Sequence, residues 1–247
     1  MVTDHRKVNR VTDAEALAKA AADRLMARIA ENKASIAICL TGGSSPKKLY
    51  ELLATDAYRN EIPWDRIHWF IGNERFVPAS DPRNNMAMAR AVLLDAFASA
   101  SHIHPIPTDT TSYEESAVRY ERQLQSFYGA ERLDDVRPLF DLVLMGVGPD
   151  GHTASVFPGY PAMLESARWV VGVPQAHVEP FVPRVTLTLP ALGSCREMLF
   201  EVSGSSKRAI LTRVLGGENL PASLARSVGE TILLADQAAV PEDLGGN

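Results

Sequence analysis

The sequence predicts an α/β fold with a mainly parallel, doubly wound sheet and helices on both of its faces. One observation is that short, continuously apolar segments recur along the chain, as in SIAICL at residues 35–40. Such runs are typical of strands that are buried on both faces. A second observation is that these segments alternate with helical patterns, which favours parallel strands joined by helices.

The first half of the chain contains two predicted strand–loop–helix units. Before them, Thr12 and Glu15 have the spacing of a capping box, which predicts an alanine-rich helix that runs to about Ile29. The strand at residues 35–40 then leads through the loop TGGSSP into a helix in KKLYELL. The second unit has a strand within RIHWFIGNERF and a helix within NNMAMARAVLLDAF.

The second half of the chain continues the pattern. A third strand, in FDLVLM, also ends at a glycine loop, GVGPDGH. Four later segments are predicted strands, with a helix at SSKRAILTRVL between the last two: RWVVGV, RVTLTL, EMLFEV and TILLAD. Proline-containing stretches near residues 104–107 and 174–183 are predicted loops. Because no low-complexity linker divides the chain, we expect residues 1–247 to form a single domain.

The composition argues against several classes of partner. A formal net charge of −5 gives no global reason to bind nucleic acid or an anionic membrane. Cys39 and Cys195 have neither metal-site spacing nor the pattern of a secreted disulfide framework. The first residues lack the apolar core of a signal peptide, and no stretch approaches the ~18 apolar residues of a membrane span. We therefore expect a cytoplasmic protein.

The loop TGGSSP is the first of three candidate ligand loops, because ligands of open α/β sheets gather at the carboxyl ends of the strands. Gly42 and Gly43 allow close approach of the backbone, Ser44 offers a hydroxyl, and Pro46 suits the first turn of a helix. Phosphate fits such a loop, and a tight turn with a serine cap is the alternative. The loop matches neither of the usual nucleotide-binding glycine motifs.

The second loop, GNERFVP, places Glu74 and Arg75 just after a strand. The guanidinium of Arg75 can pair with a phosphate or a sugar carboxylate, or else form an internal ion pair with Glu74. Two other basic residues can share an anion with it. Arg184 opens a strand, and Lys207 stands at the start of a helix. Each of them taken alone is more simply a solvated surface charge.

The third loop, GVGPDGH, presents an aspartate and a histidine on a backbone with three glycines. Histidine can accept a proton near neutral pH, and a neighbouring carboxylate fixes its tautomer and orientation. Asp150 and His152 are candidates for these two roles. The alternative is that Asp150 caps a turn and His152 makes a structural hydrogen bond. His102 and His104 share a face on an extended segment, but no third ligand has metal-site spacing.

Four segments, in this order and spacing, closely resemble the 6-phosphogluconolactonases of the glucosamine-6-phosphate isomerase/6-phosphogluconolactonase superfamily. They are TGGSSPKKLYELL, WFIGNERFVPASDPRNNMAMAR, FDLVLMGVGPDGHTASVFPG and PRVTLTLPAL. The resemblance covers nearly the whole chain. It implies a modified Rossmann-like sheet and hydrolysis of 6-phospho-D-glucono-1,5-lactone to 6-phosphogluconate, in the pentose phosphate pathway, without metal or organic cofactor.

The resemblance also implies roles for individual residues. Asp150 and His152 would stand at the lactone, with His152 as the general base and glycine-loop amides around the developing oxyanion. A second group would hold the 6-phosphate or line the substrate pocket: Gly42, Gly43, Ser44, Asn73, Arg75, Arg184 and Lys207.

The chain departs from the family pattern at two places. Asn73 stands where the family usually has aspartate, and the lysine that usually precedes the RVTLTL strand is absent, which leaves His177 as a weaker substitute. Two other functions therefore stay open. One is a glucosamine-6-phosphate deaminase, which normally has an Asp-Glu-Tyr motif where this chain has Asn73-Glu74-Arg75. The other is a catalytically impaired protein that binds sugar phosphates.

Overall fold

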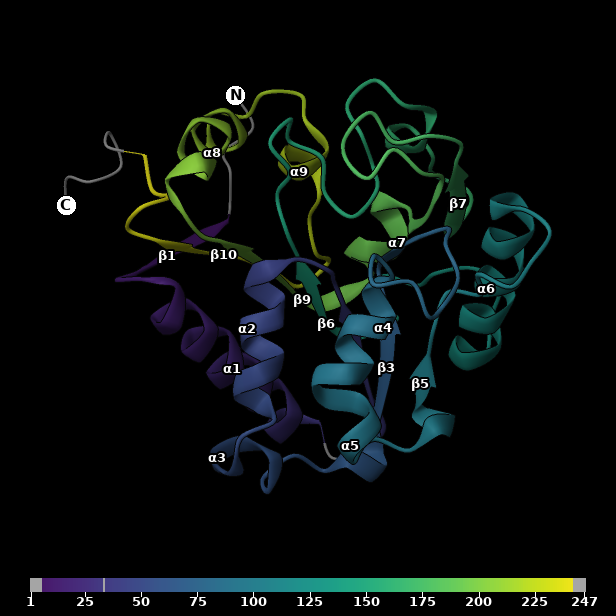
Figure 1. Ribbon diagram of the computed structural model, residues 1–247, viewed down its shortest axis with the longest axis horizontal. Coiled ribbons are helices and arrows are strands. Elements are labelled where there is room, and N and C mark those ends of the chain that lie inside the picture. The colour runs from purple at the N-terminus through teal and green to yellow at the C-terminus, as the bar shows by residue number, and fades with distance from the viewer. Residues whose placement is uncertain (1–5, 33, 242–247) are drawn as a thin grey trace.

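The chain alternates strands and helices in the computed structural model shown in Figure 1, which describes residues 6–32 and 34–241. The strands are β1 (Lys7–Val11), β2 (Ile36–Leu40), β3 (Ile67–Ile71), β4 (Asn73–Arg75), β5 (Ile103–His104), β6 (Phe140–Met145), β7 (Val170–Val173), β8 (Arg184–Leu187), β9 (Cys195–Val202) and β10 (Glu230–Asp236). The helices are α1 (Ala14–Glu31), α2 (Ser44–Leu53), α3 (Asp56–Arg59), α4 (Asn85–Ala89), α5 (Asp95–Phe97), α6 (Tyr113–Tyr128), α7 (Leu189–Gly193), α8 (Arg208–Leu215) and α9 (Pro221–Leu224). A π-helical turn, Arg90–Leu94, joins α4 to α5.

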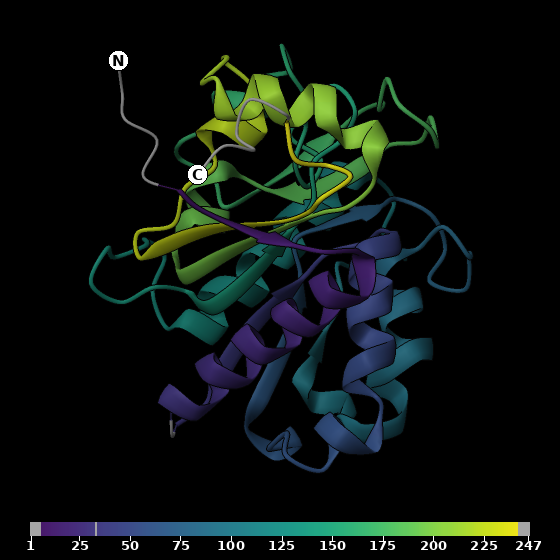
Figure 2. The ribbon, with the colours of Figure 1, turned by 90° about the vertical axis from the view of Figure 1, so that its left-hand side faces the viewer.

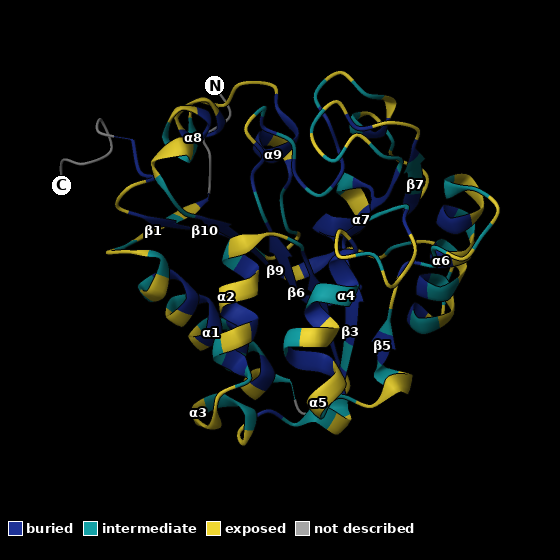
Figure 3. Cartoon of the chain, viewed as in Figure 1, coloured by how far each residue is buried: buried dark blue, intermediate teal, exposed yellow. Residues whose placement is uncertain are grey.

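Seven strands form one sheet in the order β1-β10-β9-β6-β2-β3-β5, and every neighbouring pair in it is parallel. This confirms the predicted, mainly parallel α/β sheet. Figure 2 shows α1 and α2 on one side of the β1-β10-β9 part of the sheet and α8 on the other. The inner strands β2 and β6 are buried at every position, as their continuous apolar sequences predict (Figure 3).

Two of the predicted strand segments, RWVVGV and RVTLTL, do not join this sheet, nor does the end of a third segment at residues 73–75. The strands β4, β8 and β7 form a separate antiparallel sheet in that order. The segments RWVVGV and RVTLTL are therefore strands, as expected, but they lie outside the parallel sheet. They follow each other along the chain with only a loop between them, so they can pair antiparallel without a crossover helix.

The start of α1 also differs from the prediction. The side chain that caps the helix is Asp13, whose Oδ1 accepts the amides of Glu15 and Ala16 at 3.0 and 2.9 Å. Thr12 instead donates its hydroxyl to Asp13. The predicted capping box of Thr12 and Glu15 was thus wrong by one residue, because a carboxylate accepts amide hydrogen bonds better than a hydroxyl does.

The parallel sheet brings the three candidate loops to one edge. β2, β3 and β6 are neighbours, and the chain leaves each of them at its carboxyl end. The arrowheads of β5 and β6 in Figure 1 point to this edge, where α7, α8 and α9 also lie. Within the described residues, no helix is long and apolar enough to cross a membrane.

Two buried glutamates on β9 have contrasting surroundings. Glu197 accepts hydrogen bonds from Nε of Arg24 at 2.5 Å and Nε of Arg28 at 2.6 Å, both on α1. Glu201, four residues further on the same face, is 3% exposed, and neither of its oxygens has a hydrogen-bond partner in the described chain. Burial raises the pKa of Glu201 from its ordinary 4.5 to about 8, so the side chain is a buried carboxylic acid at neutral pH.

We predict that Glu201→Met stabilises the protein by about 1–3 kcal/mol, because it removes an unsatisfied buried polar group. Between pH 4.5 and 8 the folded chain keeps a proton that the unfolded chain has released, so stability falls as pH rises through this window. The gain should therefore be larger at pH 8 than at pH 5 in urea unfolding. The matched change Glu197→Met should destabilise the protein, since it removes the buried carboxylate that accepts from Arg24 and Arg28 and leaves these arginines only the exposed Glu31 and longer contacts with Glu230. A loss of stability in Glu201→Met at pH 8 would contradict the interpretation that buried Glu201 destabilises the protein.

Candidate active site

Short contacts join the three loops into one site. A Cβ on Gly42 would lie 1.9 Å from Oδ1 of Asn85, so only glycine lets the first loop approach the start of α4 this closely. Asn85 in turn donates from Nδ2 to the backbone oxygen of Asn73 at 2.9 Å. The side chain of Asn73 is buried and donates to Oγ of Ser155 at 2.8 Å, beyond the third loop. The loops are therefore held in fixed relation to one another.

Arg75 and Arg184 lie side by side, because they are paired residues in the antiparallel β4–β8 ladder. Arg75 donates from Nη1 to Oδ1 of Asn85 and to the backbone oxygen of Arg83, and Arg184 donates from Nη2 to the backbone oxygen of Pro180 at 2.9 Å. Nε of each arginine is buried and has no hydrogen-bond partner among the described residues. Arg184 is buried and Arg75 is half-buried, and neither forms an ion pair among the described residues, so together they form a binding site for an anion.

The pKa values of Arg75 and Arg184 reflect their burial and the charges that lie close to them. Burial and the positive charge of Arg75 together lower the pKa of Arg184 to about 10, against the opposing charge of Glu74. Burial also lowers the pKa of Arg75, again opposed by Glu74. Both guanidinium groups nevertheless keep their charge at neutral pH, so an anion that approaches them meets two full positive charges.

The carboxylate of Glu74 is engaged by the backbone. It accepts the amides of Asn85 at 2.6 Å, Met86 at 2.9 Å and Arg75 at 2.8 Å. The first two belong to the first turn of α4, whose amides have no partner within the helix. Burial raises the pKa of Glu74 to about 7, against these three hydrogen bonds and the charge of Arg75. The ion pair with Arg75, which the sequence left as an alternative, does not form; the carboxylate accepts these amides instead.

A cavity of about 290 Å³ opens next to the arginine pair. Gly43 and Ser44 line it, with Arg75 and Pro180. Gly43 has φ of +120° and precedes the first turn of α2, where amide groups and the positive end of the helix dipole favour an anion. Of the residues predicted to hold a phosphate, the structure thus brings Gly43, Ser44 and Arg75 to one cavity, with Arg184 buried beside Arg75.

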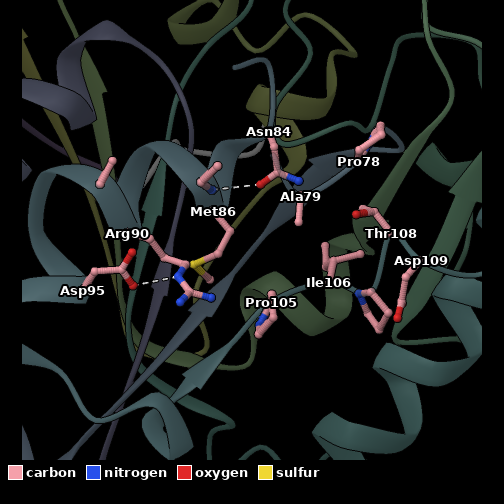
Figure 4. A pocket seen from close by; sticks show the side chains of 13 residues that line it. Pro78, Ala79, Asn84, Met86, Arg90, Asp95, Pro105, Ile106, Thr108 and Asp109 are labelled. Atoms are coloured by element: carbon pink, nitrogen blue, oxygen red, sulfur yellow. Dashed lines mark hydrogen bonds and ion pairs between the residues drawn. The ribbon is translucent and has the colours of Figure 1, made fainter. Parts of the chain in front are cut away.

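A larger cavity, of about 670 Å³, adjoins α4 between the π-helical turn and the segment 105–109 (Figure 4). Its walls are mostly apolar, and include Met86, Pro105 and Ile106. The arginine that lines it, Arg90, is neutralised by Asp95 at 2.7 Å. The smaller cavity is therefore the better anion site, because Arg75, which lines it, and Arg184 beside it have no such carboxylate partner among the described residues.

The third loop forms a hydrogen-bonded turn that presents His152. Oδ1 of Asp150 accepts the backbone amide of His152 at 3.1 Å and lies 2.5 Å from Nδ1 of its ring. The turn role and the orienting role of Asp150, which the sequence left as alternatives, thus occur together. Because the carboxylate accepts, Nδ1 of His152 carries the proton, and Nε2 of the neutral ring is free to accept one. The ring lies over Gly148, where a Cβ would come within 2.0 Å of it.

Two further side chains, those of Lys207 and His177, contact the third loop rather than the arginine pair. Lys207 donates to the backbone oxygen of Val147 at 2.6 Å; burial lowers its pKa, and the charge of Asp150 opposes this. Nε2 of His177 lies 2.7 Å from Oδ2 of Asp150. Burial raises the pKa of Asp150, but its bonds and charge interaction with His152, with the bond from His177, outweigh burial and keep that pKa well below its ordinary value. The suggestion that His177 replaces the absent lysine at the phosphate therefore finds no support in these contacts.

The other histidines that the structure describes, His68, His102 and His104, lie in a separate cluster on β3 and at β5. Nδ1 of His68 is 2.9 Å from Nε2 of His104, and the ring of His102 packs on His68 at 4.4 Å. Burial, with smaller effects of His68 and His102, lowers the pKa of His104 to about 4. The described residues include no group of three or more histidine, cysteine or acidic side chains suited to a metal ion.

An α/β protein with its candidate site at the carboxyl edge of a parallel sheet is the class that this geometry defines. The sequence matches, over residues 12–233, the family of glucosamine-6-phosphate isomerases/6-phosphogluconolactonase. The chain therefore belongs to this family, as the sequence motifs predicted.

Curated relatives and solved structures agree with this membership. The 6-phosphogluconolactonase of Synechocystis sp. is 39% identical over 208 residues, which are 82% of each chain. That of Streptomyces coelicolor is 35% identical over 93% of this chain and 92% of its own. The crystal structure of 6-phosphogluconolactonase from Thermotoga maritima has a TM-score of 0.80 at 29% identity and covers 94% of this chain and 100% of that one. A monomeric glucosamine-6-phosphate deaminase has the same TM-score at 20% identity, which shows the shared fold alone.

Two glycines of the third loop provide a matched test of its geometry. Gly148→Ala should push the His152 ring away from Asp150 and cost about 1–3 kcal/mol of stability, because the new methyl overlaps the ring. Gly146→Ala should be tolerated, since a Cβ there meets nothing within 4 Å. The measurement is the ¹H NMR signal of the His152 Nδ1 proton, which should be lost only in the first variant. An unchanged signal in Gly148→Ala would show that the ring does not occupy this position.

Proposed function

We propose that this protein hydrolyses 6-phospho-D-glucono-1,5-lactone to 6-phospho-D-gluconate. The observation that carries the proposal is the combination, in loops and strands joined by hydrogen bonds, of the Arg75–Arg184 pair, which has no ion-pair partner among the described residues, with an oriented Asp150–His152 pair. A sugar-phosphate lactone offers what each pair needs, a phosphate dianion and an electrophilic carbonyl. Membership of a family whose matched relatives are named 6-phosphogluconolactonase supports the same substrate.

In this proposal the 6-phosphate binds in the cavity beside Arg75 and Arg184. Nε and the terminal nitrogens of the two guanidinium groups are donors with the geometry that phosphate oxygens accept. Ser44 and the amides of the first turn of α2 complete the binding site, and Gly42 and Gly43 let the backbone reach it. Lys207 lies with Asp150, so we assign it to the lactone end of the substrate rather than to the phosphate.

The proposed chemistry uses His152 as the general base. Nε2 takes a proton from a water molecule as the water oxygen bonds to C1 of the lactone, and the carbonyl electrons move onto the carbonyl oxygen. Backbone amides of the glycine loops stabilise this oxyanion. The C1–O5 bond then breaks, and the imidazolium returns its proton to O5, which becomes the hydroxyl of the open acid. Asp150 stabilises the imidazolium through Nδ1.

In the proposed site Asn73 acts through hydrogen bonds rather than through charge. Its Nδ2 donates to Ser155, and its backbone oxygen accepts from Asn85, so an amide can hold the second and third loops together. An amide cannot abstract a proton from a carbon acid as a carboxylate can, which argues against the deaminase reaction at this position. We further propose a cytoplasmic location with no nucleic-acid or membrane partner, on the net charge of −5 and the two free, buried cysteines.

His152→Asn should lower kcat/KM for the lactone about 10²–10⁴-fold, because it removes the general base. Glucose-6-phosphate dehydrogenase can generate the lactone in the assay, and its disappearance is compared with spontaneous hydrolysis. His102→Asn is the matched control in the separate histidine cluster and should keep full activity. If the unaltered protein gives no rate above spontaneous hydrolysis, a protein that only binds sugar phosphates is the better description.

Arg184→Met should lower kcat/KM for the phosphorylated lactone roughly 10–100-fold, since a charge-assisted hydrogen bond contributes about 1.5–3 kcal/mol. The loss should appear mainly in KM. Unphosphorylated glucono-1,5-lactone is the control substrate, and its slower turnover should be the same in both proteins. Equal losses on the two substrates would place Arg184 outside the phosphate site.

A further inference from the structure

His177 contacts the proposed catalytic carboxylate from a different part of the chain. It lies in the segment 174–183 that connects β7 to β8, and its Nε2 is 2.7 Å from Oδ2 of Asp150. The rings of Phe157 and Tyr160 pack against it at 5.0 and 5.4 Å between ring centres. Although its side chain is 41% exposed, these contacts fix the ring with Nε2 toward Asp150.

One carboxylate thus lies between two imidazoles. Oδ1 of Asp150 bonds to Nδ1 of His152, and Oδ2 bonds to Nε2 of His177. An ionised carboxylate only accepts hydrogen bonds, so the nitrogen that faces it on each ring must carry a proton. The ring of Phe157, which packs on both histidines, keeps them on either side of the carboxylate.

The charged groups around Asp150 come from several elements. His152 is on its own loop, His177 is on the β7–β8 segment, and Lys207 precedes α8. Arg213 of α8 also interacts with the charge of Asp150, although its guanidinium is paired with Glu218. Tyr160 is a further titratable side chain, and its ring packs against that of His177. Of these, His152 and His177 bond directly to the carboxylate oxygens.

We propose that His177 is a positioning residue. Its Nε2 donates a hydrogen bond to Asp150, and this limits how strongly Asp150 stabilises the protonated form of His152. The proposal rests on the proposed lactonase function, in which His152 must be neutral to accept a proton from water. A carboxylate that already accepts one strong hydrogen bond is a weaker partner for a second donor. His177 therefore favours the neutral, active form of His152 at lower pH.

The consequence is a specific change in pH dependence. Without His177, Asp150 should stabilise the His152 cation more strongly, so the base is lost to protonation at a higher pH. The acid limb of kcat/KM reports this ionisation in the free enzyme. In His177→Ala we expect the limb to move up by about half a unit to one unit. A residue that only supports the fold would lower activity equally at every pH.

The experiment compares three variants of the full chain with the unaltered protein between pH 5 and 8. His177→Ala removes the donor. His177→Gln keeps a neutral N–H donor and should return the acid limb to the position seen in the unaltered protein. Phe181→Ala is the matched control, because this exposed side chain lies in the same segment. Its acid limb should not move, and thermal unfolding should show all three variants to be folded.

An upward shift in His177→Ala that is absent from His177→Gln and Phe181→Ala supports the proposal. An unmoved acid limb in His177→Ala, or an equal shift in His177→Gln or in Phe181→Ala, overturns it. The ionisation of His152 can also be followed by NMR without substrate. A protein with no lactone turnover would therefore refute the proposed function, while the NMR titration still decides the role of His177.

Discussion

The candidate site depends on the hydrogen bonds that one buried carboxylate, that of Glu74, accepts. It accepts three backbone amides, two of them at the start of α4, and so fastens β4 to that helix. Because Glu74 bonds to amides, it makes no ion pair with Arg75 or Arg184, and the described chain supplies no other carboxylate to them. Buried charge without a partner is costly in the free protein. An incoming phosphate offsets that cost, so the bonding of Glu74 favours anion binding at this place.

Each of the two sheets carries one part of the proposed site. The parallel sheet supplies the loop with Asp150 and His152, while the small antiparallel sheet carries the arginine pair and, on the segment between β7 and β8, His177. The loop that follows β6 of the parallel sheet is joined to the small sheet at Ser155, which accepts from the side chain of Asn73 and donates its amide to Oγ1 of Thr186 at 3.1 Å. The distance between the phosphate end and the lactone end of the site is therefore set by bonds between the sheets. This also explains why an amide at position 73 can support the site.

Much of this arrangement could be predicted from the sequence, and the failures have physical causes. The buried strands and their glycine loops have strong local patterns, so the parallel sheet and the Asp150–His152 loop were predicted correctly. The separate antiparallel sheet was missed, because strand pairing depends on long-range contacts that a local pattern does not contain. The helix α6 was missed although its Ser112 cap and Glu115 are a recognisable signal. Glu74 bonds to the amide of Asn85, 11 positions away, and His177 bonds to Asp150, 27 positions away. Nothing in the sequence next to either residue indicates these hydrogen bonds.

The central claim is that one substrate spans the arginine pair and the Asp150–His152 pair. A crystal structure with 6-phosphogluconate, the proposed product, tests this most directly. The claim predicts phosphate oxygens within hydrogen-bond distance of Arg75 and Arg184, and the C1 carboxylate of the product beside Nε2 of His152. A product molecule whose phosphate lies at Lys207, or in the larger cavity beside Arg90, would contradict it.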